Sequence, residues 1–219
     1  MPNSRIASAR LYGFIDTAYL AGRNPKDLTR AMIEGGVDII QVRAKELTHP
    51  QRVELISAVL GTAFRSHVPV IVNDDITAAF ETGADGVHLG QEDWAAIPRD
   101  KRAEQLASMR IVGISTHSLE QALAAERAGA NYIGVGPVFP TATKPGVSPV
   151  GLELIGQVKE RVAVPFFAIG GIDLGNIDQV LEAGATRVAV VSAILKATDV
   201  RQAVAALKER LGAYAVSES

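Results

Sequence analysis

Eight short apolar segments rich in β-branched residues recur along the chain, separated by stretches of helical character. They cover residues 11–15, 37–42, 68–72, 86–89, 110–114, 132–135, 164–169 and 187–191. Most are apolar throughout instead of alternating with polar residues, which is typical of parallel strands whose outer face is covered by helices. The pattern therefore predicts an α/β fold built on a parallel sheet.

A glycine-containing phrase is repeated four times, and each copy leads directly into an expected strand. The copies are Glu34-Gly35-Gly36-Val37-Asp38, Thr82-Gly83-Ala84-Asp85-Gly86, Ala128-Gly129-Ala130-Asn131-Tyr132 and Ala183-Gly184-Ala185-Thr186-Arg187. Glycine ends a helix readily because it adopts the left-handed conformation without Cβ strain. The copies lie about 46 to 55 residues apart, roughly two strand–helix units, so they mark strands two, four, six and eight.

This period predicts a single (β/α)8 TIM barrel domain over residues 1–219. The alternative, a doubly wound open sheet, usually has fewer strands and a glycine-rich turn after the first one, which residues 11–16 lack. Asn24-Pro25, Asp75 and Ser118 are expected to begin helices as N-cap residues, and residues 98–104 are expected to form a surface excursion.

The composition excludes several functional classes. The 219 residues include no cysteine, so disulfides, thiolate metal sites and cysteine nucleophiles are excluded, and the net charge is only -2. A nearly balanced charge does not attract nucleic acid or a membrane surface as a whole, so an anionic ligand must meet a local cluster. With no apolar segment of signal-peptide length at the start, we expect a soluble cytoplasmic protein; association into a homo-oligomer stays open.

In a barrel the functional groups follow the carboxyl ends of the strands. After strand two, the two-residue period of extended chain puts Gln41, Arg43 and Lys45 on one side and Val42 and Ala44 on the other. Two cations and an amide are therefore expected at the barrel mouth, the alternative being an ordinary solvent-facing loop.

Acidic groups follow strands three and four. Asp74 comes after Asn73, and Asp93 follows His88 by five residues. Two carboxylates facing the cations of strand two could hold Mg2+, which prefers oxygen ligands. His88 lies within an apolar strand, so a core histidine and a catalytic base are both compatible with its position.

Hydroxyl groups follow strands five and six. Ser115 could donate to an anion, whereas His117 is either a ligand or an exposed loop residue. Thr141, Thr143 and Lys144 stand between prolines in one loop, where restricted backbone lowers the entropy lost when a ligand is clamped.

After strand seven come Gly170-Gly171, and Ser192 follows strand eight, the usual position of a backbone phosphate site in this architecture. Two anion sites follow: a cationic one suited to a departing diphosphate, and a neutral one suited to a spectator monophosphate.

The ordered set of motifs resembles the thiamine phosphate synthase family over nearly the whole chain. The motifs are Gln41-Val42-Arg43-Ala44-Lys45, Asn73-Asp74, Val87-His88-Leu89-Gly90-Gln91-Glu92-Asp93, Gly113-Ile114-Ser115-Thr116-His117, Gly136-Pro137-Val138-Phe139-Pro140-Thr141-Ala142-Thr143-Lys144, Ala168-Ile169-Gly170-Gly171-Ile172 and Val191-Ser192-Ala193-Ile194. The resemblance implies a barrel that joins hydroxymethylpyrimidine diphosphate to hydroxyethylthiazole phosphate and releases pyrophosphate, through a pyrimidine carbocation.

By position, the resemblance also implies roles for individual residues. Asp74 and Asp93 would hold Mg2+. The pyrimidine diphosphate would be bound by Gln41, Arg43, Lys45, Asn73, Ser115 and Lys144, of which Arg43, Lys45, Ser115 and Lys144 would be catalytic. Thr141 and Thr143 would hold the departing diphosphate or the thiazole substrate, and Gly171, Val191 and Ser192 would hold the thiazole phosphate.

Two departures from the family pattern are visible: Ala44 replaces a frequent acidic residue, and Asp16-Thr17 resembles the usual first strand end only loosely. The alternatives are a thiazole tautomerase of the same superfamily, which needs no diphosphate clamp, and a non-catalytic barrel that binds a thiamine precursor.

Overall fold

The computed structural model describes residues 4–98, 102, 109–141, 143 and 146–217. Its strands form one closed barrel in the order β1 to β8, with every neighbouring pair parallel. The strands are β1 (Leu11–Asp16), β2 (Ile39–Arg43), β3 (Val70–Asn73), β4 (Gly86–Leu89), β5 (Ile111–Thr116), β6 (Tyr132–Val135), β7 (Phe166–Ile169) and β8 (Val188–Ala189). The predicted TIM barrel is confirmed, with each strand overlapping the expected segment.

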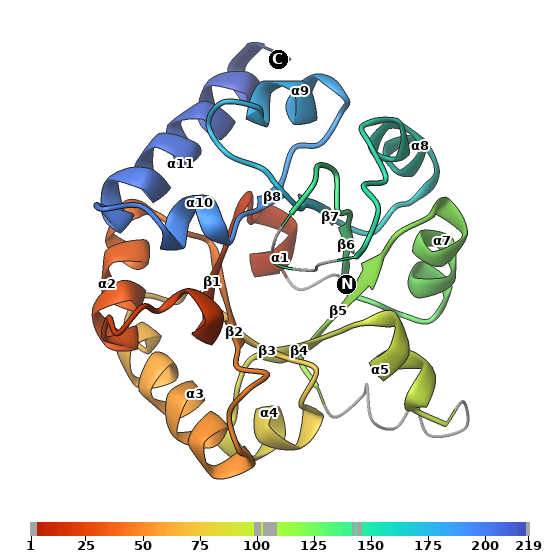
Figure 1. Cartoon of the computed structure of the whole chain (residues 1–219). Coiled ribbons are helices and arrows are strands. Elements are labelled where there is room, and N and C mark those ends of the chain that lie inside the picture. Colours follow the sequence, from red (N-terminus) through yellow and green to blue (C-terminus); the bar gives the residue numbers. More distant parts are fainter. Residues whose placement is uncertain (1–3, 99–101, 103–108, 142, 144–145, 218–219) are drawn as a thin grey trace.

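Helices surround the strands in Figure 1, except for α1 (Ser4–Ser8), which lies near the centre of the view. The others are η1 (Thr17–Tyr19), α2 (Pro25–Gly35), α3 (His49–Ala63), α4 (Ile76–Thr82), α5 (Gln91–Ala96), α7 (Leu119–Arg127), α8 (Glu153–Arg161), α9 (Ile177–Glu182), α10 (Ser192–Leu195) and α11 (Val200–Ser217). Within the described residues, none of these helices is long and apolar enough to cross a membrane.

The predicted N-caps are confirmed. Asn24 accepts a hydrogen bond from Lys26 N at the start of α2, Asp75 accepts one from Ala78 N at α4, and Ser118 accepts one from Gln121 N at α7. A side-chain oxygen at this position satisfies an amide that the helix itself leaves without an acceptor. Most of the expected surface excursion, residues 98–104, lies outside the described residues.

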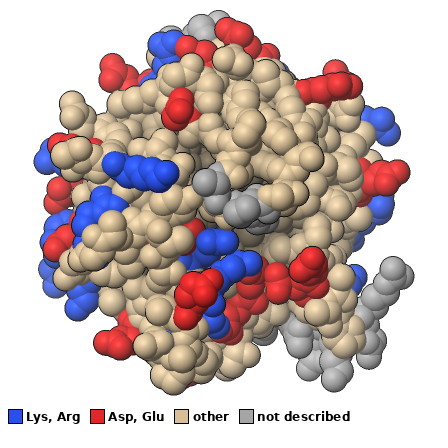
Figure 2. Space-filling view, viewed as in Figure 1, with Lys and Arg blue, Asp and Glu red and all other residues tan. Residues whose placement is uncertain are grey.

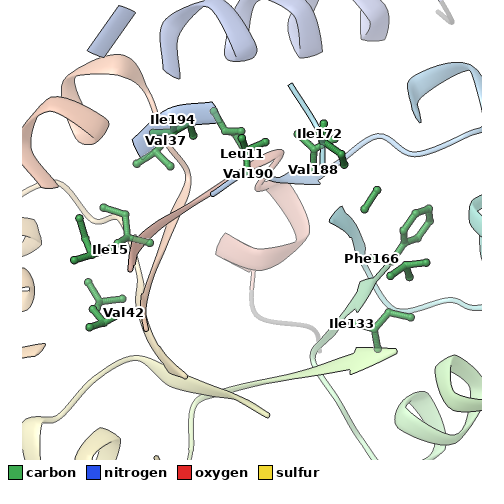
Figure 3. Packing of buried hydrophobic residues seen from close by; sticks show 14 of the residues in the cluster. Leu11, Ile15, Val37, Val42, Ile133, Phe166, Ile172, Val188, Val190 and Ile194 are labelled. Carbon is green, nitrogen blue, oxygen red and sulfur yellow. The ribbon is translucent and has the colours of Figure 1, made fainter. Parts of the chain in front are cut away.

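The larger hydrophobic core lies between the barrel and its helices. It contains outward-facing strand residues such as Ile15 and Val42 together with Val37 and Ile194, all of which are drawn in Figure 3. Both faces of each strand are therefore buried, which explains why the strand segments are apolar throughout.

A second, smaller core fills the barrel interior. Alternate strand residues point inward, and the rings of Tyr12, Phe14, Tyr132 and Phe167 pack with centroids 5.2 to 5.8 Å apart. At the amino-terminal end, Ile6 of α1 belongs to the same cluster, so this short helix closes the bottom of the barrel.

The repeated glycine phrase has the same structure in all four copies. Gly36, Gly83, Gly129 and Gly184 have φ between +67° and +107°, and each N–H donates to the carbonyl three residues earlier at 2.8 to 3.2 Å. The next residue donates to the carbonyl five residues earlier at 3.0 to 3.2 Å. These two backbone hydrogen bonds end a helix at a left-handed residue. The phrase is therefore the helix-to-strand joint that its spacing predicted.

The same phrase also joins neighbouring strands. Asp38 N donates to Leu11 O at 3.0 Å, and Leu11 N donates back to Asp38 Oδ2 at 2.8 Å. The same reciprocal pair links Asp85 to Val70 and Asn131 to Val112. A side-chain oxygen thus satisfies an amide at the start of the preceding strand, and β2 begins at Ile39 because residues 37 and 38 belong to this joint.

Replacement of Asp38 by alanine is expected to destabilise the fold by about 2 to 3 kcal/mol, because its carboxylate also accepts from Arg10 N and pairs with Lys208. Urea denaturation measures this as a lower midpoint at unchanged slope. Asp27→Ala, which removes an exposed pair with Arg30, is the matched control and should cost under about 0.5 kcal/mol. Equal losses in the two variants would contradict the structural role of the joint.

Candidate active site

A pocket of about 900 Å³, including open space at its mouth, lies at the carboxyl ends of the strands. Polar and aromatic side chains from β1 to β7 line it together with the loops after β6, β7 and β8. Of the predicted site residues, Gln41, Arg43, Asn73, Ser115, Thr141, Thr143, Gly171, Val191 and Ser192 line this pocket. Residues far apart in sequence are therefore gathered around one opening.

Arg43 is held by a buried carboxylate. Its Nη1 donates to Asp16 Oδ2 at 2.9 Å, and Asp16 is 1% exposed while the Arg43 side chain is 15% exposed. The strand register places the two residues opposite each other. Because Asp16 engages one guanidinium nitrogen, the remaining donors of Arg43 stay available to a ligand in the pocket.

An acidic pair follows β3 and β4 next to this pocket, where Asp74 and Lys45 line an adjoining hollow that shares Asn73 with it. The carboxylates of Asp74 and Asp93 are neighbours beside Gly90, and Lys45 Nζ lies 3.4 Å from Asp74 Oδ2. Partial burial, followed by the negative charge of Asp74, raises the pKa of Asp93 above its ordinary value. Figure 2 shows acidic and basic side chains side by side near the centre of the face seen in Figure 1. The Lys45–Asp74 and Asp74–Asp93 contacts bring together three of the predicted site residues.

The backbone of Asp74 is unusual. Its φ is +63°, a left-handed conformation that side-chain-bearing residues adopt at a cost of about 1 to 3 kcal/mol. Gly90 N donates to Asp74 Oδ1 at 3.2 Å, and Asn73 Nδ2 donates to Asp74 Oδ2. The strained backbone and these donors together aim the carboxylate toward Asp93.

The donor set fits a magnesium ion. In the described part of the chain, no group of three or more His, Cys, Asp or Glu side chains could hold a metal. Two carboxylates that repel each other nevertheless match an ion that usually takes one or two protein carboxylates and completes its shell with water and substrate phosphate.

The loop after β6 runs alongside β7 at the edge of the pocket. Val138 N donates to Ile169 O at 2.9 Å and Phe139 N donates to Gly170 O at 3.0 Å. Thr143 Oγ1 lies 3.0 Å from the hydroxyl of Tyr19, which ties this loop to η1. Lys144, predicted to bind the diphosphate, lies outside the described residues.

The opposite side of the pocket carries no charged side chain among the described lining residues. Gly170 and Gly171 have φ of +104° and +68°, and a Cβ atom at Gly171 would lie 2.7 Å from Pro140 O. Only glycine therefore fits there. Val191 and Ser192 line the same side at the start of α10, so a neutral backbone surface faces the charged one.

Gln41 and Ser115 lie deeper in the barrel. Gln41 is 2% exposed and donates from Nε2 to the Tyr12 hydroxyl at 2.8 Å, while Ser115 Oγ lies 2.9 Å from His88 Nε2. His88 is therefore a partner of Ser115 and is 8% exposed. His117 also lines the pocket, and its Nδ1 contacts Gly136 O.

Asp16, Tyr12 and Tyr132 are site residues that were not predicted from the sequence. The signal was present in β1, where the two-residue period puts Tyr12, Phe14 and Asp16 on the inner face, as it does Gln41 and Arg43 on β2. Asp75, interpreted as an N-cap, does not line the main pocket and contacts Arg52.

Comparison with known proteins agrees with this geometry. The model of the thiamine monophosphate synthase family matches residues 11–194. A thiamine-phosphate synthase from Thermus thermophilus is 47% identical over 186 residues, covering 84% of this chain and 88% of that protein. One from Halalkalibacterium halodurans is 42% identical over 193 residues, covering 88% and 90%.

Among solved structures, thiamine phosphate pyrophosphorylase from Pyrococcus furiosus superposes with a TM-score of 0.84 at 34% identity, covering 97% of this chain and 99% of that one. Family model, relatives and structure agree over nearly the same residues. The chain is therefore a transferase that belongs to the thiamine monophosphate synthase family.

Proposed function

We propose that the enzyme joins hydroxymethylpyrimidine diphosphate to hydroxyethylthiazole phosphate in a magnesium-dependent reaction and releases pyrophosphate. The observation that supports this most is the division of one pocket into two sides. Arg43 and Asn73 line one side, next to an adjoining hollow that Lys45 and Asp74 line, and a neutral backbone surface lies on the other side. A leaving diphosphate needs the first side, whereas a phosphate that does not react needs only the second.

In this reaction the bond between the pyrimidine methylene carbon and the diphosphate oxygen breaks, and the oxygen keeps the electron pair. Arg43 and Lys45 would donate to the diphosphate as its charge grows, which lowers the barrier because the contacts are strongest in the transition state. The Asp16–Arg43 ion pair, at 2.9 Å, supports this role because it orients the guanidinium before substrate binds.

Asp74 and Asp93 would hold Mg2+, which supplies positive charge to the diphosphate oxygens. Lys45, 3.4 Å from Asp74, would then contact both the acidic pair and the same anion.

The thiazole nitrogen would capture the positively charged pyrimidine methylene carbon and form the new carbon–nitrogen bond. This dissociative route needs no protein nucleophile. Gly171, Val191 and Ser192 would hold the thiazole phosphate, because backbone N–H groups can approach an anion closely where a glycine carries no side chain. Thr141 and Thr143 line the pocket from the loop after β6 and would contact the diphosphate or the thiazole substrate.

The central test is to mix both substrates with Mg2+ and measure pyrophosphate and thiamine phosphate. Arg43→Ala is expected to lower turnover about a hundredfold or more, since it removes a donor to developing charge. The affinity for thiazole phosphate should change little, because that ligand is assigned to the other side of the pocket. Arg30→Ala, which alters an exposed residue of α2, is the control and should behave as wild type.

Other outcomes of the same assay favour the alternatives. Isomerisation of the thiazole without pyrophosphate release would identify a tautomerase. Tight binding of either substrate without turnover would identify a non-catalytic binding protein.

Asp93 also allows a test independent of activity. A carboxyl group whose pKa is raised on folding stabilises the folded state at low pH, and this contribution is lost as the pH rises through the folded-state pKa. The Asp74–Asp93 repulsion grows as the pH rises through this pKa, so above it Asp93→Asn is expected to raise the melting temperature without added metal.

In wild type, MgCl2 should raise the melting temperature more than NaCl of equal ionic strength, because the ion binds only the folded state. Asp93→Asn should lose that difference, while Glu92→Gln, the neighbouring exposed position, should keep it. An equal magnesium effect in all three proteins would contradict the assignment of Asp93.

A further inference from the structure

A continuous chain of hydrogen bonds crosses the barrel interior from one side of the pocket floor to the other. Gln41 Nε2 donates to Tyr12 Oη at 2.8 Å, and Tyr12 Oη lies 2.8 Å from Tyr132 Oη. Tyr132 Oη lies 3.0 Å from His88 Nδ1, and His88 Nε2 lies 2.9 Å from Ser115 Oγ. The five residues come from β2, β1, β6, β4 and β5, so the chain exists only in the closed barrel.

The direction of these hydrogen bonds follows from counting protons. An amide nitrogen only donates, so Tyr12 accepts from Gln41. Tyr132 is the other partner given for the Tyr12 hydroxyl, and we assign it as the acceptor of the Tyr12 proton. Tyr132 in turn donates to His88 Nδ1. A neutral imidazole that accepts at Nδ1 carries its proton at Nε2 and donates it to Ser115. The proton of Ser115 is then directed away from His88.

Burial keeps both phenols in the protonated form that this count needs. Tyr12 and Tyr132 are 1% and 0% exposed, and burial raises the pKa of each phenol above the ordinary value of 10.0. Each therefore contributes one proton and one acceptor to the chain.

Strand β5 leaves room for the contact between Tyr132 and His88 because it carries glycine at position 113. A Cβ atom at Gly113 would lie 2.1 Å from Tyr132 Cζ and 2.6 Å from His88 Nδ1, distances that real Cβ atoms essentially never show. Glycine at this inward position of β5 is therefore required for Tyr132 and His88 to meet.

We propose that Tyr12, Tyr132 and His88 are positioning residues that hold Ser115 as a hydrogen-bond donor and the Gln41 carbonyl as an acceptor toward the ligand. This inference rests on the proposed contact of Ser115 and Gln41 with the pyrimidine diphosphate. All five residues line the pocket. Because each proton is donated to the next residue, reversing one hydrogen bond requires reversing the others. These five hydrogen-bonded residues, called the relay below, therefore fix the ligand contacts of Gln41 and Ser115 together.

The variant Tyr132→Phe tests the relay, because it keeps the aromatic ring and removes the hydroxyl between Tyr12 and His88. We expect kcat/KM for the pyrimidine diphosphate to fall about tenfold, the loss of roughly one hydrogen bond. The KM for thiazole phosphate should change less than twofold. Adding Tyr132→Phe to Ser115→Ala should have no further effect, because the relay acts through Ser115.

Thr116→Val is the matched control. Thr116 is the next residue of β5, is 0% exposed, and donates from Oγ1 to Gly134 O at 2.9 Å outside the relay. This variant also loses a buried hydroxyl and should lower the melting temperature, but kcat/KM should match wild type. A fall in kcat/KM of equal size in both variants would overturn the relay as a positioning device.

Nitrogen-15 NMR of histidine-labelled protein gives a readout that does not depend on turnover. The chain has four histidines, so His88 can be assigned by its His88→Gln variant. We expect a protonated Nε2 and an unprotonated Nδ1 for His88 in wild type, and a mixture of tautomers in Tyr132→Phe. A protonated Nδ1 in wild type would overturn the proposed direction.

Two different results would contradict the proposed reaction and the proposed positioning role. Absence of pyrophosphate release from wild type removes the proposed reaction. Normal turnover in Ser115→Ala, with release intact in wild type, overturns only the ligand contact on which the relay acts.

Discussion

When eight parallel strands close into a barrel, alternate side chains point into a narrow interior. Polar groups buried there need hydrogen-bond partners. The contents of that interior change along its axis. At the bottom, Ile6 of α1 meets apolar residues such as Ile39 and Ile71. At the middle, Tyr12 and Tyr132 share hydrogen bonds, which removes the penalty of burying their hydroxyls. At the mouth the inward positions carry the charged residues Asp16 and Arg43. The packed core and the charged site therefore lie one above the other inside the same barrel.

The charged layer combines favourable and unfavourable interactions. The buried carboxylate of Asp16 pairs with Arg43, which keeps the guanidinium oriented at an energetic cost that the ion pair offsets. Asp74 and Asp93 instead repel each other, and Asp74 adopts a left-handed backbone. Repulsion and backbone strain at a pocket mouth are typical of groups selected for a ligand and not for stability of the empty protein.

The sequence predicted most of the fold and many of the residues that line the pocket. The four glycine phrases marked four helix-to-strand joints, and Asn24, Asp75 and Ser118 began helices, because these signals act over a few residues. The alternation of Gln41, Arg43 and Val42 assigned each side chain to the inner or outer face. Asp16 was missed as the partner of Arg43, because pairing between strands depends on register across 27 residues. Lys144, predicted on the resemblance, lies outside the described residues.

By itself the sequence determined which residues face inward, the approximate position of each strand, and which polar groups follow each strand, because these depend on local periodicity and turn chemistry. Only the tertiary structure decided which of those groups meet. Tyr12, Tyr132, His88 and Ser115 belong to four strands, and their hydrogen bonds exist because the barrel closes with one register and Gly113 leaves space between them. Contacts of this kind depend on the closed shape of the whole sheet, which no short segment of sequence contains.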